Sequence, residues 1–117
     1  MSEIIDIKLS ELTDSLPDGV YNIITEFFSL QDGDGYSIIA IVKGEKTILS
    51  DSGDMSFKWR IGELEPLKQN DINPVATCWI EIVLKGGEMR AEIETKQIVF
   101  RVKNFLQVMI VLDNMRS

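Results

Sequence analysis

The chain has 117 residues, a formal net charge of −7, 44% hydrophobic residues, one cysteine and no histidine. We predict one domain over residues 1–117, with enough apolar side chains to bury a core. The lack of histidine excludes Ser-His-Asp and Cys-His catalysis and most zinc sites, and a single cysteine excludes a disulfide framework. No signal peptide is recognisable and no apolar run has the ~18 residues of a membrane span, so we expect a cytoplasmic protein.

Residues 3–16 have the apolar spacing of a helix. Four aliphatic residues follow one face of a 3.6-residue period: Ile5, Leu9, Leu12 and Leu16. Pro17-Asp18-Gly19 would end this helix in a turn. The same residues also fit a strand from Ile4 to Leu9 that is followed by a helix with Ser10 as its N-cap. The sequence leaves both alternatives open.

Three strands are predicted next. Val20 to Phe28 is rich in β-branched and aromatic residues, which favour strands. A loop of Asp and Gly then leads to a second strand, Tyr36 to Lys43, whose nearly continuous apolar run is typical of an interior strand. Gly44-Glu45 reverses the chain into a third strand, Lys46 to Leu49.

A short helix is predicted after the third strand. Ser52 or Asp54 would cap it, and Gly62 limits its length. Its segment Phe57-Lys58-Trp59-Arg60 interleaves aromatic and basic residues, as proteins that bind single-stranded nucleic acids do. We therefore include Trp59 among the candidate partner-binding residues, with packing in the core as the alternative.

The second half of the chain is predicted to hold a polar connection, two strands and a long helix. The connection covers residues 66–74, and the strands cover Thr77 to Lys85 and Glu88 to Glu94. Thr95 would cap the helix, which runs from Lys96 to about Met115. Six residues form its apolar stripe: Ile98, Val102, Phe105, Leu106, Met109 and Ile110. Four more widen that stripe: Val99, Val108, Val111 and Leu112.

The order of these elements predicts an α+β fold. We expect a sheet of about five mainly antiparallel strands, an N-terminal helix, a short middle helix and a long C-terminal helix packed on one face. The apolar stripe of the last helix is wider than one sheet face requires. We therefore also predict that the chain forms a homodimer through Lys96 to Met115.

The net negative charge lies entirely in the first 34 residues, which carry eight acids and one base. This distribution argues against direct binding to the phosphates of nucleic acids, which requires clustered Lys and Arg. It permits docking on a basic protein, with Asp14, Asp18, Asp32 and Asp34 as the candidate contacts. The alternative is that these acids only keep the surface soluble.

A turn of acids, serine and glycine follows the third strand at Asp51-Ser52-Gly53-Asp54. Loops at strand ends often carry functional groups, and two carboxylates three residues apart can share a divalent ion. We therefore consider a metal site with Asp34, Glu45, Asp51 and Asp54 as its ligands. The alternative is a turn and helix cap, in which these side chains accept hydrogen bonds from free backbone N–H groups.

Several short motifs lie around the predicted strands and in the last helix. They are Asp18-Gly19-Val20, Thr25-Glu26-Phe27, Asp34-Gly35-Tyr36-Ser37-Ile38, Ile48-Leu49-Ser50-Asp51-Ser52-Gly53-Asp54, Phe105-Leu106-Gln107 and Val111-Leu112-Asp113. Together they resemble the bacterial and phage family known as domain of unknown function 1828. The resemblance implies a small module of bacterial, phage or mobile-element origin and no known reaction.

These observations lead to three hypotheses. The first is a non-enzymatic protein-binding module without a cofactor, acting as an inhibitor that occupies the basic nucleic-acid-binding surface of a host protein. The second is a carboxylate-metal hydrolase, or a nucleotide-binding domain, that uses the Asp51–Asp54 loop. The third is a dimeric structural accessory protein.

Overall fold

The computed structural model describes residues 3–76 and 79–115. Its strands are β1 (Ile4–Lys8), β2 (Gly19–Phe28), β3 (Gly35–Lys43), β4 (Lys46–Ser50), β5 (Val83–Lys85) and β6 (Glu88–Glu94). Its α-helices are α1 (Asp54–Ile61), α2 (Gln69–Ala76) and α3 (Ile98–Asn114). Two 3₁₀ turns, η1 (Leu9–Glu11) and η2 (Thr95–Gln97), complete the described elements.

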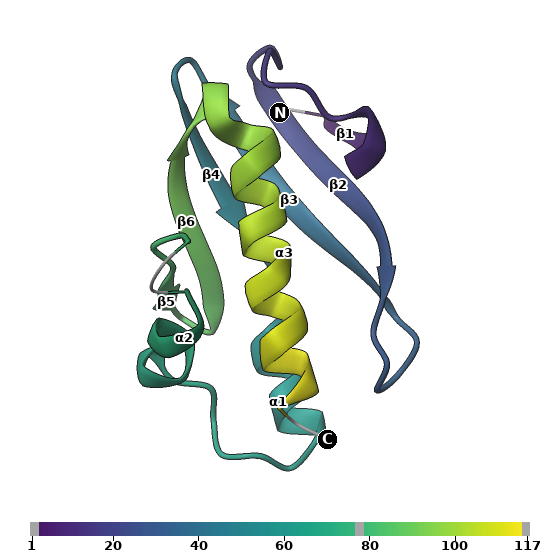
Figure 1. The fold of residues 1–117 in the computed structure, drawn as a ribbon, viewed down its shortest axis with the longest axis vertical. Helices are drawn as coiled ribbons and strands as arrows, with labels where there is room; N and C mark the ends of the chain where they lie inside the picture. The colour runs from purple at the N-terminus through teal and green to yellow at the C-terminus, as the bar shows by residue number, and fades with distance from the viewer. Residues whose placement is uncertain (1–2, 77–78, 116–117) are drawn as a thin grey trace.

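The strands form one sheet in the order β1-β2-β3-β4-β6-β5, and α3 lies across one face of it (Figure 1). The pairing of β1 with β2 is parallel, and the other pairings are antiparallel. The predicted α+β class and the long C-terminal helix are thus confirmed. The sheet differs from the prediction in being mixed and in having a sixth strand.

Strict alternation of side chains places the core between the sheet and α3. Ile23, Ile38 and Leu49, from three neighbouring strands, are fully buried on the covered face. Phe105 and Met109 of α3 are fully buried as well. Because strand side chains point alternately to the two faces, this burial fixes the register of each strand relative to the helix.

The helix alternative for residues 3–16 is wrong, and the strand of the other alternative is confirmed over Ile4–Lys8. Ile4–Lys8 is an extended strand paired with β2, and only the single turn η1 follows it. Isoleucine favours strands because its branched side chain suits the pleated surface, and pairing with β2 adds to this preference. Leu12 is nevertheless buried. Its apolar side chain therefore serves contact with the core, although its spacing from Ile5 and Leu9 suggested a helix.

The segment from residue 66 to residue 85 also differs from the prediction. The polar connection contains α2, in which Ile72 and Ala76 are buried four residues apart on one face. The predicted strand from Thr77 is paired only at Val83–Lys85, and residues 77 and 78 lie outside the described residues. Because most residues of α2 are polar, the sequence did not indicate a helix with Ile72 and Ala76 as its buried face.

The start of α3 is capped by a residue that sequence reasoning did not select. Thr95 was the predicted N-cap, but its hydroxyl lies 2.7 Å from that of Thr47 and it begins the turn η2. The carboxylate of Asp14 instead accepts a hydrogen bond from the backbone N–H of Val99 at 3.0 Å. A side chain 85 residues away in sequence thus occupies the capping position.

The wide apolar stripe of α3 is used within a single chain. Beyond the sheet, α1 and α2 also pack against α3. Val102, Val108 and Leu112 are fully buried, whereas Phe100 is 61% exposed. The width of the stripe therefore no longer argues for a second copy, and the homodimer stays a prediction.

Candidate functional site

The face of the sheet opposite α3 is open and carries a row of aliphatic side chains. Val20, Ile41 and Ile48 are direct cross-strand neighbours on β2, β3 and β4, and Ile4 continues the row on β1. None of these residues is buried, and Ile4 is 61% exposed. An aliphatic row that crosses four strands is therefore accessible on this face.

A second row extends the same open face. Asn22 and Ile39 are register partners, and Ile24 pairs with Ser37 two residues further along the strands, on the same face. The edge of the face on the β6 side is charged, because Arg90 and Glu92 are exposed there. Contiguous exposed apolar surface with a polar rim is characteristic of interaction sites in soluble proteins. We call this region, formed by Ile4, Val20, Ile24, Ile39, Ile41 and Ile48, the open sheet face.

The far end of α3 holds a polar cluster that ties three elements together. The side chain of Lys58 on α1 is only 3% exposed, and its Nζ lies 2.9 Å from Asp32 and 3.9 Å from Asp34 of the β2–β3 loop. Asp113 of α3 is fully buried and accepts hydrogen bonds from Ser29, at 2.5 Å, and from the hydroxyl of Tyr36. These contacts fix the loop against both helices.

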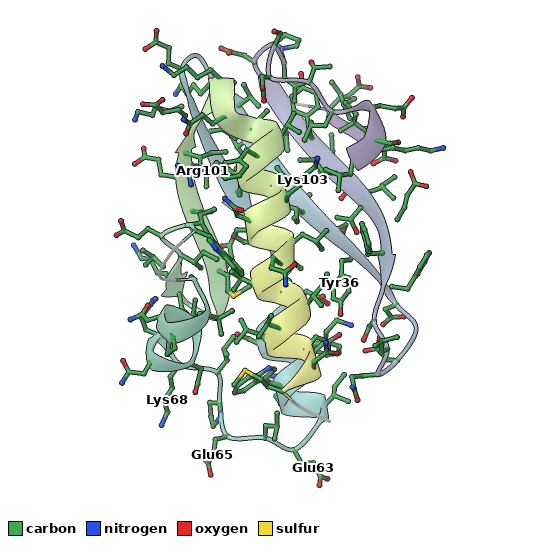
Figure 2. The ribbon with its side chains drawn as sticks, viewed as in Figure 1. Tyr36, Glu63, Glu65, Lys68, Arg101 and Lys103 are labelled. Atoms are coloured by element: carbon green, nitrogen blue, oxygen red, sulfur yellow. The ribbon has the colours of Figure 1, made fainter. Side chains whose placement is uncertain are left out.

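Tyr36 lies beside the C-terminal half of α3 (Figure 2). Burial, together with its hydrogen bond to Asp113, raises the pKa of the Tyr36 phenol far above its ordinary value. The phenol is therefore neutral and acts as a donor at physiological pH. In the described part of the chain, no buried side-chain nitrogen or oxygen atom is without a hydrogen-bond partner. The cluster is accordingly a satisfied network that stabilises the fold.

Asp51 secures the turn between β4 and α1. Its Oδ1 accepts hydrogen bonds from the N–H groups of Gly53 at 2.8 Å and Met89 at 2.9 Å, and its Oδ2 accepts one from Met55 at 3.0 Å. Burial raises the pKa of the Asp51 carboxyl, and the three N–H donors oppose that shift. The alternative of a turn in which a side chain accepts free backbone N–H groups is confirmed for Asp51. The N-cap position of α1 is Gly53, so neither Ser52 nor Asp54 caps the helix.

The structure does not gather the four candidate metal ligands. Asp51 and Asp54 interact electrostatically across their turn, and burial raises the pKa of Asp54. The backbone carbonyl of Glu45, however, accepts the N–H of Thr95 just before α3 begins, at the end of the helix opposite Asp113. Across residues 3–76 and 79–115, no group of three or more acidic, histidine or cysteine side chains is arranged to hold a metal ion.

The candidate partner-binding aspartates lie at two separate ends of the molecule. Asp14 contacts the start of α3 through Val99, whereas Asp32 and Asp34 lie at Lys58 near the end of α3. Val99 and Asp113 are 14 positions apart, which corresponds to about 21 Å of helix. Asp18 belongs to the first end, where its carboxylate accepts the N–H of Gly44 at 2.7 Å. The four aspartates therefore do not form one patch.

Trp59, the fifth candidate, is a core residue. It is 6% exposed, and its indole N–H donates to the carbonyl of Leu112 at 3.0 Å. This corrects its assignment to the contact surface. The prediction that β3 is an interior strand is confirmed, but its continuous apolar run did not reveal that one face of the sheet is left uncovered.

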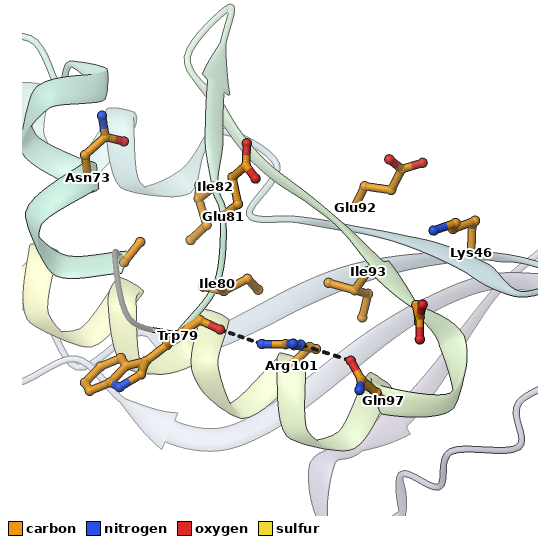
Figure 3. Close-up of a pocket in the computed structure, with 12 residues that line it drawn as sticks. Lys46, Asn73, Trp79, Ile80, Glu81, Ile82, Glu92, Ile93, Gln97 and Arg101 are labelled. Atoms are coloured by element: carbon orange, nitrogen blue, oxygen red, sulfur yellow. Dashed lines mark hydrogen bonds between the residues drawn. The ribbon is translucent and has the colours of Figure 1, made fainter.

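A hollow of about 620 Å³ lies beside β6, between that strand and the segment Trp79–Ile82 (Figure 3). Its walls combine acidic and aliphatic side chains, and Arg101 of α3 lies at its base. Arg101 Nη1 donates to the carbonyl of Trp79 at 2.6 Å, and its Nε donates to Gln97 at 3.4 Å.

Comparison with known proteins finds no match to any protein-family model, to any curated protein or to any solved structure. The resemblance to domain of unknown function 1828 thus stays a prediction. Among the described helices, none is both long and apolar enough to cross a membrane.

Proposed function

We propose that this chain is a non-enzymatic protein-binding module that contacts its partner through the open sheet face. One observation carries the proposal: Val20, Ile41 and Ile48 form a cross-strand aliphatic row on a face where none of them is buried. Covering such a row with a partner removes apolar surface from water, which is worth about 25 cal/mol per Å² before the costs of association.

The polar clusters support binding over catalysis as the proposed role. Lys58 is paired with two aspartates, and both carboxylate oxygens of Asp51 accept backbone N–H groups. Groups that are engaged in this way hold loops in place and offer little to a substrate. The proposal therefore assigns them to stability, and it assigns recognition to the sheet.

The inhibitor version of the proposal adds a basic, nucleic-acid-handling partner. The acids at the two ends of α3 would then contact separate basic regions of that partner, on either side of the apolar contact. Two double variants test this version: Asp14→Asn with Asp18→Asn, and Asp32→Asn with Asp34→Asn. Each double variant should bind the partner more weakly and with a smaller salt dependence than wild type. If neither pair of substitutions changes the affinity, the inhibitor version is wrong. That result would not contradict binding through the open sheet face.

The proposal is tested by affinity capture with two matched variants. The tagged chain is incubated with nuclease-treated lysate of its source organism, and the bound proteins are identified by mass spectrometry. Ile41→Glu places a charge on the open sheet face, and Phe100→Glu places the same charge at an exposed position of α3. We expect a specific partner that wild type and Phe100→Glu retain and that Ile41→Glu loses.

Two results would contradict the proposal. A partner retained equally by both variants would place the contact elsewhere. Recovery of the chain alone, sedimenting as a dimer that Ile41→Glu dissociates, would favour the structural accessory hypothesis. Circular dichroism of both variants shows whether each one folds.

A further inference from the structure

The outer edge of β6 is only partly paired. β6 has seven residues, but β5 pairs with Glu88, Met89 and Arg90 alone. Beyond Arg90, no backbone hydrogen bond joins the described segment Trp79–Ile82 to Ala91–Glu94. The two arms of the β5–β6 hairpin therefore separate, and the hollow of about 620 Å³ lies between them (Figure 3).

Side chains of α2 and α3 hold the arms apart. Arg101 and Asn104 both donate to the carbonyl of Trp79, at 2.6 and 3.3 Å. The amide of Gln69 donates to the carbonyl of Ile82 at 2.7 Å and accepts the N–H of Leu84 at 2.7 Å. The segment Trp79–Ile82 is thus fixed to the helices, and it does not close on β6.

The pairing of β6 with β4 shows which backbone groups of β6 face the hollow. Met89 accepts the N–H of Asp51, and Thr95 donates to Glu45, so these two residues direct their backbone groups toward β4. In an antiparallel pair this direction alternates from one residue to the next. The N–H and C=O groups of Glu92 and Glu94 therefore point away from β4, into the hollow.

The side chains around the hollow divide by polarity. Glu81, Glu92 and Glu94 are exposed, whereas Ile82 and Ile93 are buried. A strand added beside β6 would place every second residue against the glutamates and the others against the isoleucines. Two bases, Lys46 and Arg101, also line the hollow, and Lys96 Nζ lies 3.6 Å from Glu94. Opposite charges in cross-strand positions stabilise a strand pairing, so the exposed glutamates, Glu92 above all, favour lysine or arginine in the added strand.

We infer that this hollow is a docking groove for an extended segment of a partner protein in which basic and aliphatic residues alternate. The segment pairs with the backbone of Glu92 and Glu94 and adds a strand to β6. This inference rests on the proposed function, since it names the part of the partner that the module recognises. The groove adjoins the open sheet face, because Glu92 is the register partner of Ile48.

The inference is tested with the isotope-labelled full chain and the peptide Ac-Lys-Val-Lys-Val-Lys-NH₂. We expect saturable changes in the amide NMR signals of Glu92, Glu94 and Glu81. Two control peptides separate charge from backbone pairing: Ac-Glu-Val-Glu-Val-Glu-NH₂, and the lysine peptide N-methylated at its lysines. Both should bind more weakly, because the first repels the glutamates and the second cannot pair with β6.

A matched pair of variants tests the charge requirement. Glu92→Gln with Glu94→Gln should raise the Kd for the lysine peptide roughly three- to tenfold. Glu3→Gln with Glu11→Gln removes the same charge from exposed positions outside the groove and should leave the Kd unchanged. Both double variants replace exposed residues, and thermal unfolding checks that they fold.

Three outcomes would overturn the inference. They are the absence of changes at Glu92 and Glu94 up to about 5 mM peptide, equal binding of the acidic or N-methylated peptide, and changes confined to the other sheet edge, β1. Because the titration needs no natural partner, its failure is distinct from failure of the proposed function. Capture that depends on Ile41 would still support the open sheet face.

Discussion

Asp51 is the residue on which the turn after β4 depends. One buried carboxylate accepts three backbone N–H groups, from its own turn, from the start of α1 and from β6. The sequence identified the turn and offered capping as one of two interpretations. The donor from Met89 could not be inferred, since it comes from a strand 38 residues away that only the folded sheet brings near.

The first prediction concerns Asp51→Asn. Asparagine keeps the oxygen that serves Gly53 and Met89 but turns an N–H₂ group toward the N–H of Met55. We expect the free energy of unfolding to fall by about 2 kcal/mol, the cost of an unpaired buried donor. Urea denaturation measures the change. Asp18→Asn, which affects one exposed hydrogen bond, is the control, and equal effects of the two substitutions would contradict the account.

The second prediction concerns the pH dependence contributed by Asp54. Burial raises the pKa of its carboxyl above the ordinary value of 3.8, so the folded chain takes up this proton before the unfolded chain does. Ionised Asp54 therefore lowers stability at pH 7, and that loss disappears as the pH falls through the raised pKa toward 3.8. Asp54→Asn should be more stable than wild type at pH 7, by less than about 1 kcal/mol because the site is partly exposed.

Thermal unfolding of both proteins from pH 7 to pH 4 checks this sign. The stability difference should shrink as the pH falls. If Asp54→Asn is instead less stable at pH 7, the attraction of Lys58 and of the α1 N-terminus for the carboxylate outweighs its burial.

At the scale of elements, the contact between α1 and the β2–β3 loop depends on one lysine. Lys58 is almost completely buried, whereas Asp32 is partly exposed and Asp34 is largely exposed. The loop is closed internally by hydrogen bonds from the N–H of Ser29 to Asp34 and from the N–H of Gly33 to Ser29. The ion pair thus links the closed hairpin end to α1, and the hydrogen bond from Ser29 to Asp113 links it to α3.

The third prediction is that Lys58→Met loosens this loop. The remaining aspartates keep contact with water, so we expect a loss of about 1–2 kcal/mol, less than for a fully buried pair. Hydrogen exchange of the Ser29 and Gly33 amides should accelerate about tenfold, because the loop opens without the rest of the sheet. Adding Asp32→Asn to Lys58→Met should cost little more. A double variant that loses the full sum of the single effects would show that the two side chains are not coupled.

The elements that sequence reasoning identified correctly have strong local signals. β2, β3, β4 and β6 combine β-branched residues with glycine turns, and α3 has a long apolar period. The failures lie where tertiary contact decides. The sequence allowed both a helix and a strand at residues 4–9, and β1 is a strand because β2 offers it a parallel partner. Helix α2 formed around Ile72 and Ala76 although its composition is polar.

The candidate site was less predictable than the fold. Whether an acidic or aromatic residue reaches a surface depends on which strand neighbours which and on where α3 lies. Trp59 and the four aspartates were selected by residue type, and the structure buries the first and separates the others into two pairs. The grouping of Glu81, Glu92 and Glu94 around one hollow could not be inferred from the sequence, because it requires the two arms of the β5–β6 hairpin to separate.

At the scale of the whole molecule, the helices and the open sheet face have different roles. The layer of α1, α2 and α3 completes the core, and the opposite face carries aliphatic side chains across β1 to β4. A partner that covers this face would complete a second layer, and a segment of the same partner could enter the groove beside β6. We therefore expect the partner to contact the open sheet face, and we expect no contact surface centred on α3.

Carbene footprinting of the chain, free and bound to its captured partner, tests this claim most directly, because the label reports on individual side chains. The account predicts that labelling of Ile4, Ile24 and Ile41 falls on binding, while labelling of Phe100 on α3 is unchanged. Protection of Phe100 with unchanged labelling of the three isoleucines would place the contact on the helical side and contradict the account.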